Sequence, residues 1–433
     1  MKKSVRTGTI GPVALVASAL LAGCATGPEP AAVQPPAPVE TKVPEAPTRL
    51  PDSPPAGVFR PDAPPPSAAP TPAFPPRPDA APVRPPGASG QARLLELLPP
   101  PVTKDRKGWA ADIDAAFAAL RLAPTDANYC AAIAVIEQES GFEADPVVPG
   151  LSRIAWREIE SRRQRYGVPK LALDAALAKT SPNGQSYKRR LDTLRTERQM
   201  SALYDDMVAE LPAGGLLLGG YNPVRTGGPM QVSIAFAETH ARGTPYRAAR
   251  GDLRRAVFTR HGGLHFGIAH LLDYPAPYRD PIYRFADFNA GHYSSRNASF
   301  QQAVARLTGK KLVPDGDLLR YENGRPSAAA SATQNAVLML SRRLKLSADE
   351  INAALRQEKT EAFARTPLYQ RVFALADRAA GARAPREAMP RIALKSPKIQ
   401  RKLTTEWFAK RVNMRYGHCM TRAAKALRAS KGW

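Results

Sequence analysis

Residues 125–142 read TDANYCAAIAVIEQESGF, and this stretch decides the fold expected for the folded part of the chain. Thr125 is a typical helix N-cap and Gly141 is a typical residue just after a helix end, so a helix is predicted between them. One face of this helix is apolar, at the i, i+3 and i+4 spacing: Ala132, Val135 and Ile136. The pattern predicts a buried helix over residues 127–140.

Glu139 completes the apolar face of this helix, seven positions after Ala132. Burial raises the pKa of a carboxyl group, and the negative end of the helix dipole acts in the same direction. A carboxyl group that stays protonated near neutral pH can act as the general acid of glycosidic cleavage, so Glu139 is the candidate catalytic residue. The alternative is a glutamate that only reaches solvent from the helix end. Glu137 lies about 200° from Glu139 around the helix axis and is therefore expected to face water.

The periodicity of a helix recurs through most of the chain that follows. Helices are expected over Trp109–Leu120 and Ala332–Leu346, and another helix is expected within Asp252–Tyr274. Residues 152–212 are expected to form a charged helical region, and the segment after Val313, including Lys395–Lys410, is expected to be helical and basic. Alternating strand patterns are scarce, and at most a small strand element is expected near Leu216–Val232. The sequence therefore predicts a mostly α fold.

The first residues have the pattern of a signal peptide. A positive start precedes an apolar run from Ile10 to Ala22, which is too short to span a bilayer. The run ends in Leu21-Ala22-Gly23-Cys24, which resembles the lipobox of bacterial lipoproteins. Residues 1–23 are then a signal peptide, and Cys24 becomes the lipid-bearing first residue, palmitate included. Because Ala25 rather than Asp follows, we expect a lipid-anchored protein of the outer membrane that faces the periplasm. An ordinary signal peptide with an incidental cysteine is the alternative.

More than half of the 44 prolines lie between Pro28 and Pro101. Proline favours the polyproline II conformation, so residues 24–93 are interpreted as a lipidated cysteine and a disordered Pro/Ala-rich tether. The rest of the chain carries nearly all of the formal charge of +24. A positive field favours polyanions, and the export signal points to peptidoglycan and other envelope components rather than nucleic acid. A basic surface without a single partner is the alternative.

Two cysteines remain after Cys24, namely Cys130 and Cys419. An even pair in an exported chain can form a disulfide, because the compartments outside the cytoplasm are oxidising. A buried free Cys130 is the alternative, since this residue lies one helical turn before Ile133.

Two further motifs follow Glu139-Ser140 along the chain: Gly228-Pro229-Met230-Gln231 and Phe288-Asn289-Ala290-Gly291. In this order the three motifs resemble the signatures of the lytic murein transglycosylases with a lysozyme-like fold, which read Glu-Ser, Gly-Leu-Met-Gln and Tyr-Asn-Ala-Gly. The resemblance covers about Trp109 to Thr308. The whole architecture also looks like that of a group of uncharacterised bacterial envelope lipoproteins.

The resemblance implies a reaction and a site. Glu139 protonates the glycosidic oxygen, and the C6 hydroxyl of the same sugar attacks to give a 1,6-anhydromuramyl end, with no second carboxylate and no cofactor. Ser140 steadies the acid. Four residues line the sugar groove: Met230, Gln231, Phe288 and Asn289. The implied domains are a lysozyme-like domain over 94–312 with a helical insert at about 147–224, followed by a helical, basic extension over 313–433.

Three departures from the family pattern leave another interpretation open. Glu139 and Gln231 are far apart, where the family has a short connection, Pro229 replaces the family's leucine, and Phe288 replaces its tyrosine. A lipoprotein that binds glycan without cutting it, or a scaffold or receptor that binds other envelope proteins, is therefore the alternative to an enzyme. Three histidines lie close together in the sequence: His261, His265 and His270. Because they form no His-Glu-x-x-His motif, no metal site is expected.

Overall fold

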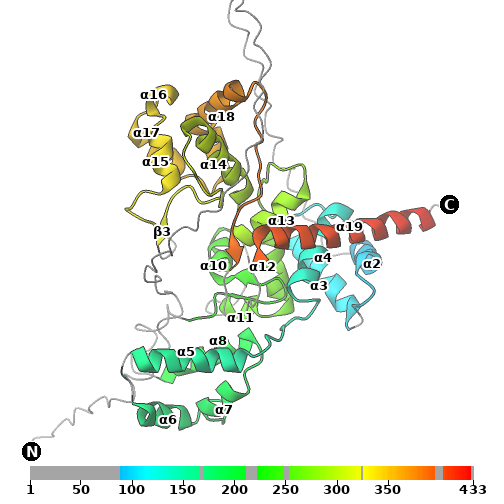
Figure 1. Ribbon diagram of the computed structural model, residues 1–433. Coiled ribbons are helices and arrows are strands. Elements are labelled where there is room, and N and C mark those ends of the chain that lie inside the picture. Colours follow the sequence, from blue (N-terminus) through cyan, green and yellow to red (C-terminus); the bar gives the residue numbers. More distant parts are fainter. Residues whose placement is uncertain are drawn as a thin grey trace, which may run out of the picture. The chain divides into compact units, whose positions relative to one another are not determined.

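The computed structural model describes residues 88–430 except 103, 166, 168, 211–221, 245, 247–252, 323–324 and 395–402. The described chain is mostly helical, with three short pairs of strands (Figure 1), so the predicted mostly α class is confirmed. None of its helices is both long enough and apolar enough to cross a membrane. The candidate signal peptide, Cys24 and nearly all of the predicted tether lie outside the described residues.

The largest hydrophobic core is built around α4, which begins at Asp126 and ends at Glu139. Thr125 caps it as predicted, because its hydroxyl oxygen accepts from the Asn128 N–H at 3.2 Å. Five other helices contribute buried residues to this core: α2 (Ala88–Leu97), α3 (Arg106–Ala119), α12 (Arg260–Leu272), α13 (Pro281–Ala290) and α19 (Thr405–Ser430). Residues of α4 from Tyr129 to Ile136 are all buried, which explains the long apolar run in this stretch.

The described residues between 147 and 210 form a helical segment with a hydrophobic cluster of its own. Its helices are α5 (Leu151–Arg165), α6 (Lys170–Ala178), α7 (Tyr187–Asp192) and α8 (Glu197–Glu210). The cluster encloses a small apolar cavity whose wall includes Ile159, Leu177 and Leu203.

A short hairpin follows, in which β1 (Thr226–Gly227) pairs antiparallel with β2 (Val232–Ser233). It falls at the end of the stretch where a small strand element was expected. Next come α10 (Ile234–Gly243) and α11 (Leu253–Val257), then α12 and α13. The helix predicted within Asp252–Tyr274 is confirmed as α12, and Thr259 caps its start by accepting from the Gly262 N–H at 3.0 Å.

The C-terminal helices surround a second core, rich in aromatic rings such as Phe300 and Phe363. Their bounds are α14 (Ser294–Thr308), α15 (Ala332–Leu338), α16 (Ser341–Leu344), α17 (Ala348–Leu355), the 3-10 helix η2 (Glu361–Arg365) and α18 (Pro367–Ala380). The one helix predicted over Ala332–Leu346 is thus two helices. A hairpin not expected from the sequence, β3 (Tyr321–Glu322) with β4 (Arg325–Pro326), lies between α14 and α15.

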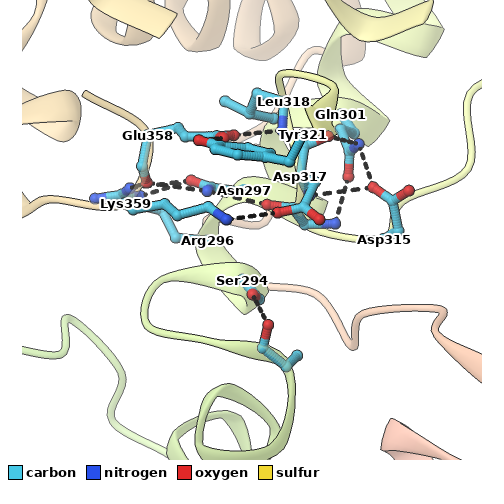
Figure 2. Close-up of polar contacts among 12 residues, drawn as sticks. Ser294, Arg296, Asn297, Gln301, Asp315, Asp317, Leu318, Tyr321, Glu358 and Lys359 are labelled. Atoms are coloured by element: carbon cyan, nitrogen blue, oxygen red, sulfur yellow. Dashed lines mark hydrogen bonds and ion pairs between the residues drawn. The ribbon is translucent and has the colours of Figure 1, made fainter. Parts of the chain in front are cut away.

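A buried polar network ties this second core together (Figure 2). The Arg296 guanidinium donates to the carbonyl oxygen of Thr360 at 2.8 Å and to that of Glu358. The Gln301 carboxamide donates to Asp315 and to the carbonyl oxygen of Asp317. Each of these four hydrogen bonds joins α14 to a loop, so they fix loops that lack regular structure of their own.

The last helix returns to the first core. β5 (Ala393–Leu394) pairs with β6 (Leu403–Thr404), and α19 follows and packs along α4 and α13. Of the segment Lys395–Lys410, which was expected to be helical, residues 395–402 lie outside the described residues, Leu403–Thr404 form β6, and α19 begins at Thr405. Cys130 and Cys419 form a disulfide with Cα atoms 5.4 Å apart, which confirms the predicted pair and joins α4 to α19.

Candidate active site

Glu139 is the last residue of α4, and its side chain is partly accessible to solvent. Its surroundings are nevertheless apolar enough that burial, together with the negative charge of Glu197, raises the pKa of this carboxyl group to about 8. Within the described residues, the Glu139 carboxyl group makes no hydrogen bond. At neutral pH this group is therefore protonated and free to donate its proton.

The chain turns sharply directly after Glu139. Gly141 and Phe142 both have positive φ angles, 59° and 66°, so the two residues reverse the chain direction. The Phe142 ring is buried and packs edge to face against Trp109, with ring centroids 5.1 Å apart. This contact holds the end of α4 against α3.

Two polar residues close to Glu139 in the chain, Ser140 and Glu137, have other partners. The Ser140 hydroxyl donates to the carbonyl oxygen of Ile136 at 3.1 Å, so it caps the helix end. Glu137, which was expected to face water, is partly exposed, and its carboxylate lies 3.5 Å from the Arg415 guanidinium of α19. The docking of α19 on α4, which sequence periodicity does not reveal, covers that side.

The motif Gly228-Pro229-Met230-Gln231 forms the turn between β1 and β2. Gly228 has a φ angle of 72°, and a Cβ atom there would lie 2.1 Å from the carbonyl oxygen of Val257. Met230 is fully buried and packs against Gly267 of α12. Close packing on a glycine-bearing helix therefore fixes this turn.

Gln231 also has a positive φ angle, 48°, and its side chain stays beside the turn. Its Oε1 atom accepts from the Thr226 hydroxyl at 3.3 Å, and its Nε2 atom lies 3.4 Å from the carbonyl oxygen of Gly228. A non-glycine residue in this conformation is strained, which indicates that the surrounding packing enforces the position of Gln231.

The third motif ends α13. Phe288 is buried between His270 and Phe408, with ring centroids 5.1 Å and 6.3 Å away. The Asn289 Oδ1 atom accepts from the Thr405 hydroxyl at 2.8 Å, at the start of α19. Both residues are thus in contact with the C-terminal helix, a partner that the sequence did not suggest.

Asp287 was not singled out from the sequence, yet it organises this motif. Its buried carboxylate accepts from the Tyr278 hydroxyl at 2.7 Å and from the backbone N–H groups of Tyr293 and Ser295 at 2.8 and 2.7 Å. Burial raises the pKa of Asp287 to about 6, although these hydrogen bonds act in the opposite direction. Because Asp287 fixes the turn at Gly291, it is a structural residue of the site.

The three motifs meet around one core rather than at one cluster of polar contacts. Ile136, Met230 and Phe288 all belong to the core around α4. Within the described chain no hydrogen bond joins the Glu139 carboxyl group to the side chains of Gln231 or Asn289. The side chain whose charge acts on Glu139 is instead Glu197, the first residue of α8. The sequence held no signal for this neighbour, because it arises from pairing between distant segments.

Of the three histidines noted in the sequence, His265 and His270 lie within a cluster of aromatic rings, whereas His261 lies beside Asp112. The ring centroids of His270 and His292 are 4.6 Å apart, and burial lowers the pKa values of these residues to about 3 and about 4. Among the residues that the structure describes, no group of three or more His, Cys, Asp or Glu side chains is arranged to hold a metal ion.

Comparison with known proteins places the chain in a family. The family model described as "Protein of unknown function (DUF1615)" matches residues 102–422. A protein of Escherichia coli (strain K12) with the name "Uncharacterized protein YaiW" is 51% identical over 321 residues, which cover 74% of this chain and 87% of that protein. No solved structure matches the chain. The match over most of its length shows that the chain belongs to the family described as "Protein of unknown function (DUF1615)".

Proposed function

We propose that the protein cleaves peptidoglycan glycan strands by a lytic transglycosylase-type reaction, with Glu139 as the acid. The observation that carries the proposal is the state of Glu139: its pKa is raised to about 8, its side chain reaches solvent, and its carboxyl group has no hydrogen bond within the described residues. A general acid must hold its proton at the working pH and must be able to reach its substrate.

The proposed reaction needs one carboxyl group. Glu139 donates its proton to the glycosidic oxygen as the bond from that oxygen to the anomeric carbon breaks. The C6 hydroxyl oxygen of the same muramyl residue bonds to the anomeric carbon, and its proton passes to the Glu139 carboxylate. The products are a free hydroxyl on one fragment and a 1,6-anhydromuramyl end on the other, and Glu139 is protonated again.

The order of local structures supports a lysozyme-like domain over about residues 94–312. A helix ends in the acid, a two-stranded hairpin carries Gly-Pro-Met-Gln at its turn, and α13 ends in Phe-Asn-Ala-Gly. In this proposal Ser140 holds the helix end, Met230 and Phe288 hold the wall of the sugar groove from behind, and Gln231 and Asn289 face the glycan. The helical segment α5–α8 is then an insert in that domain.

The protein would act while anchored to the outer membrane through lipid on Cys24, which lies outside the described residues. The lipobox-like Leu21-Ala22-Gly23-Cys24 supports this anchor. The test is Cys24→Ala in the full chain, followed by cell fractionation and palmitate labelling. We expect unlabelled precursor; a mature, tightly membrane-held Cys24→Ala protein would contradict the anchor.

A second candidate function is glycan binding without cleavage, within a scaffold or receptor for other envelope proteins. Two contacts favour it. Met230 is fully buried, and the Asn289 Oδ1 atom already accepts a hydrogen bond from Thr405. Residues that the resemblance assigns to the groove are thus partly used in packing, which suits a fold that has kept its glycan surface for binding alone.

One experiment separates the two candidates. Purified full-length protein is incubated with purified peptidoglycan, and the soluble products are identified by mass spectrometry. The enzyme proposal expects 1,6-anhydromuropeptides from the wild type and almost none from Glu139→Gln. Products with reducing ends only would make the protein a hydrolase. Intact strands that pull the protein down would favour binding without cleavage.

A further inference from the structure

Helix α19 covers the core around α4 with one face and carries positive charge on the other (Figure 1). It packs on α4, α13 and α2, and its inner face holds buried residues such as Phe408, Val412 and Cys419. Its one acid, Glu406, stands against a set of basic residues: Lys410, Arg411, Arg415, Arg422, Lys425 and Arg428.

The outer face of α19 forms one continuous stripe. Residues three or four positions apart lie on the same side of a helix, and six exposed residues follow this spacing from position 411 to position 428. At 1.5 Å per residue the stripe is about 26 Å long. It contains no carboxylate, and we call it the α19 stripe: Arg411, Met414, His418, Thr421, Lys425 and Arg428.

Carboxylates on α19 and on the helices beneath it are already paired with other cations. The pairs are Glu406 with Lys410, Glu137 with Arg415, and Asp126 with Arg93, at 2.6, 3.5 and 2.6 Å. Within the described residues, no ion pair neutralises Arg411, Lys425 or Arg428. The positive charge of the α19 stripe is therefore open to a partner from outside the chain.

Helix α19 also connects the stripe to the candidate sugar groove. The hydroxyl of its first residue, Thr405, donates to the Asn289 Oδ1 atom at 2.8 Å. Arg411 follows six residues later, about 9 Å along the helix axis. A long substrate that lies at Asn289 can thus continue along the stripe.

We infer that the α19 stripe docks the acidic stem peptides of peptidoglycan, so that the protein recognises its substrate by peptide carboxylates as well as by sugars. The inference rests on the proposed function, because it takes peptidoglycan as the partner. It assigns the C-terminal helix to one chemical part of that substrate, where the resemblance covers only residues before it.

Charge complementarity is the basis of this assignment. Stem peptides carry carboxylates and are attached repeatedly along a glycan strand, so one strand offers several anions to the cations of one stripe. A single exposed ion pair contributes little to affinity, whereas several pairs on one strand act together. The spread of Arg411, Lys425 and Arg428 along the helix suits such a partner.

The packing of α19 does not favour a membrane as the occupant. A helix that lies in a membrane interface places an apolar face among the lipids. The apolar face of α19 is instead buried against the core around α4, through residues such as Phe408 and Val412. Among the large apolar residues, the stripe holds only Met414, which is 46% exposed.

The test is cosedimentation of full-length protein with purified peptidoglycan sacculi. Both compared proteins carry Glu139→Gln, so that cleavage does not consume the ligand. Adding Arg411→Gln, Lys425→Gln and Arg428→Gln should weaken the apparent affinity about tenfold or more, because three exposed ion pairs are lost. Salt should weaken binding of the parent protein more than binding of this triple variant, since salt screens exposed charges.

A matched control removes the same charge elsewhere. Lys310, Lys311 and Arg356 are exposed cations around the second core, and no ion pair joins them to the described residues. Their combined replacement by Gln should change the affinity by less than about twofold. Equal losses in the two triple variants would overturn the inference, because net charge rather than the α19 stripe would then control binding.

Modified ligands identify the chemical partner. Sacculi whose carboxyl groups have been converted to amides should bind the parent protein about as weakly as unmodified sacculi bind the stripe variant. Undiminished binding to the amidated sacculi would refute the role of stem-peptide carboxylates. Vesicles of anionic phospholipid should bind less tightly than sacculi; tighter, stripe-dependent binding to the vesicles would make a membrane the occupant and overturn the inference.

The binding assay does not require cleavage, so docking and the proposed enzyme fail separately. Stripe-dependent binding, with no 1,6-anhydro products from the wild type, supports docking and refutes the enzyme. Products from the wild type, with equal binding of the parent protein and the stripe variant, support the enzyme and refute docking. A parent protein that does not sediment with sacculi refutes docking as well.

Discussion

Two glutamates with raised pKa values lie in different regions of the molecule, and they differ in how their carboxyl groups are held. Glu358, in the second core, accepts from the Leu318 N–H and from the Tyr321 hydroxyl, the latter at 2.6 Å (Figure 2). Burial raises its pKa to about 7, against the effect of these bonds. Glu139 has a pKa of about 8 and no such bonds within the described residues.

The comparison shows that a raised pKa indicates that a carboxyl group is buried and does not by itself indicate a catalytic role. Both oxygens of Glu358 are engaged in holding the loop between α14 and α15, so this carboxyl group stabilises the fold. The Glu139 carboxyl group has no such hydrogen bonds within the described residues and so does not stabilise a loop in this way. A buried, partly accessible carboxyl group without bonds costs stability, which is typical of functional residues.

The largest expected effect is on cleavage of peptidoglycan. Glu139→Gln should lower the turnover by about 10²–10⁴-fold, because the amide cannot supply the proton. Glu358→Gln is the matched control, a second buried glutamate changed in the same way. We expect its turnover per folded molecule to stay within about twofold of the wild type. Initial rates of muropeptide release, corrected for the fraction of folded protein, measure the turnover of both variants. Equal losses of turnover in the two variants would contradict a catalytic role that is specific to Glu139.

The disulfide lies in the core around α4, the helix that ends at Glu139, and not in the second core, near Glu358. Replacing both Cys130 and Cys419 with alanine should lower the free energy of unfolding by about 3 kcal/mol, since the cross-link constrains the unfolded chain. Docking of α19 should weaken, while the second core around Glu358 should be affected less. Hydrogen exchange on α19 and α18 would measure the contrast; equal protection of α19 in variant and wild type would argue against it.

A smaller effect on stability should separate the two glutamates directly. Glu358→Leu leaves the buried Leu318 N–H and the Tyr321 hydroxyl without an acceptor, and should cost about 2 kcal/mol. Glu139→Leu removes a carboxyl group without bonds from the end of an apolar face, so stability should stay equal or rise. Urea unfolding at pH 7 measures both changes. A larger loss in Glu139→Leu than in Glu358→Leu would show that Glu139 is structural.

Much of the fold could be predicted from the sequence because its signals are local. Helix α4 begins with the Thr125 cap and ends before Gly141, and both residues act through neighbours in the chain. Helix α12, within the stretch Asp252–Tyr274, also has a local signal for its start, the Thr259 cap.

The candidate site was predictable only in part, for a physical reason. Glu139 could be identified because desolvation and the helix dipole are both properties of its own helix. Glu197, Glu358 and the contact of Thr405 with Asn289 depend on segments far apart in sequence, in the last case 116 positions. Periodicity carries no information on such pairing, so these partners required the structure.

The central claim is that Glu139 acts in its protonated form, and the pH dependence of peptidoglycan cleavage tests it most directly. An acid is active only while protonated, so the rate should be constant up to about pH 7 and then fall with a midpoint near the Glu139 pKa of about 8. The residual rate of Glu139→Gln should lack this alkaline decline. A wild-type decline centred near 4.5, the ordinary value for glutamate, or an identical decline in Glu139→Gln, would contradict the account.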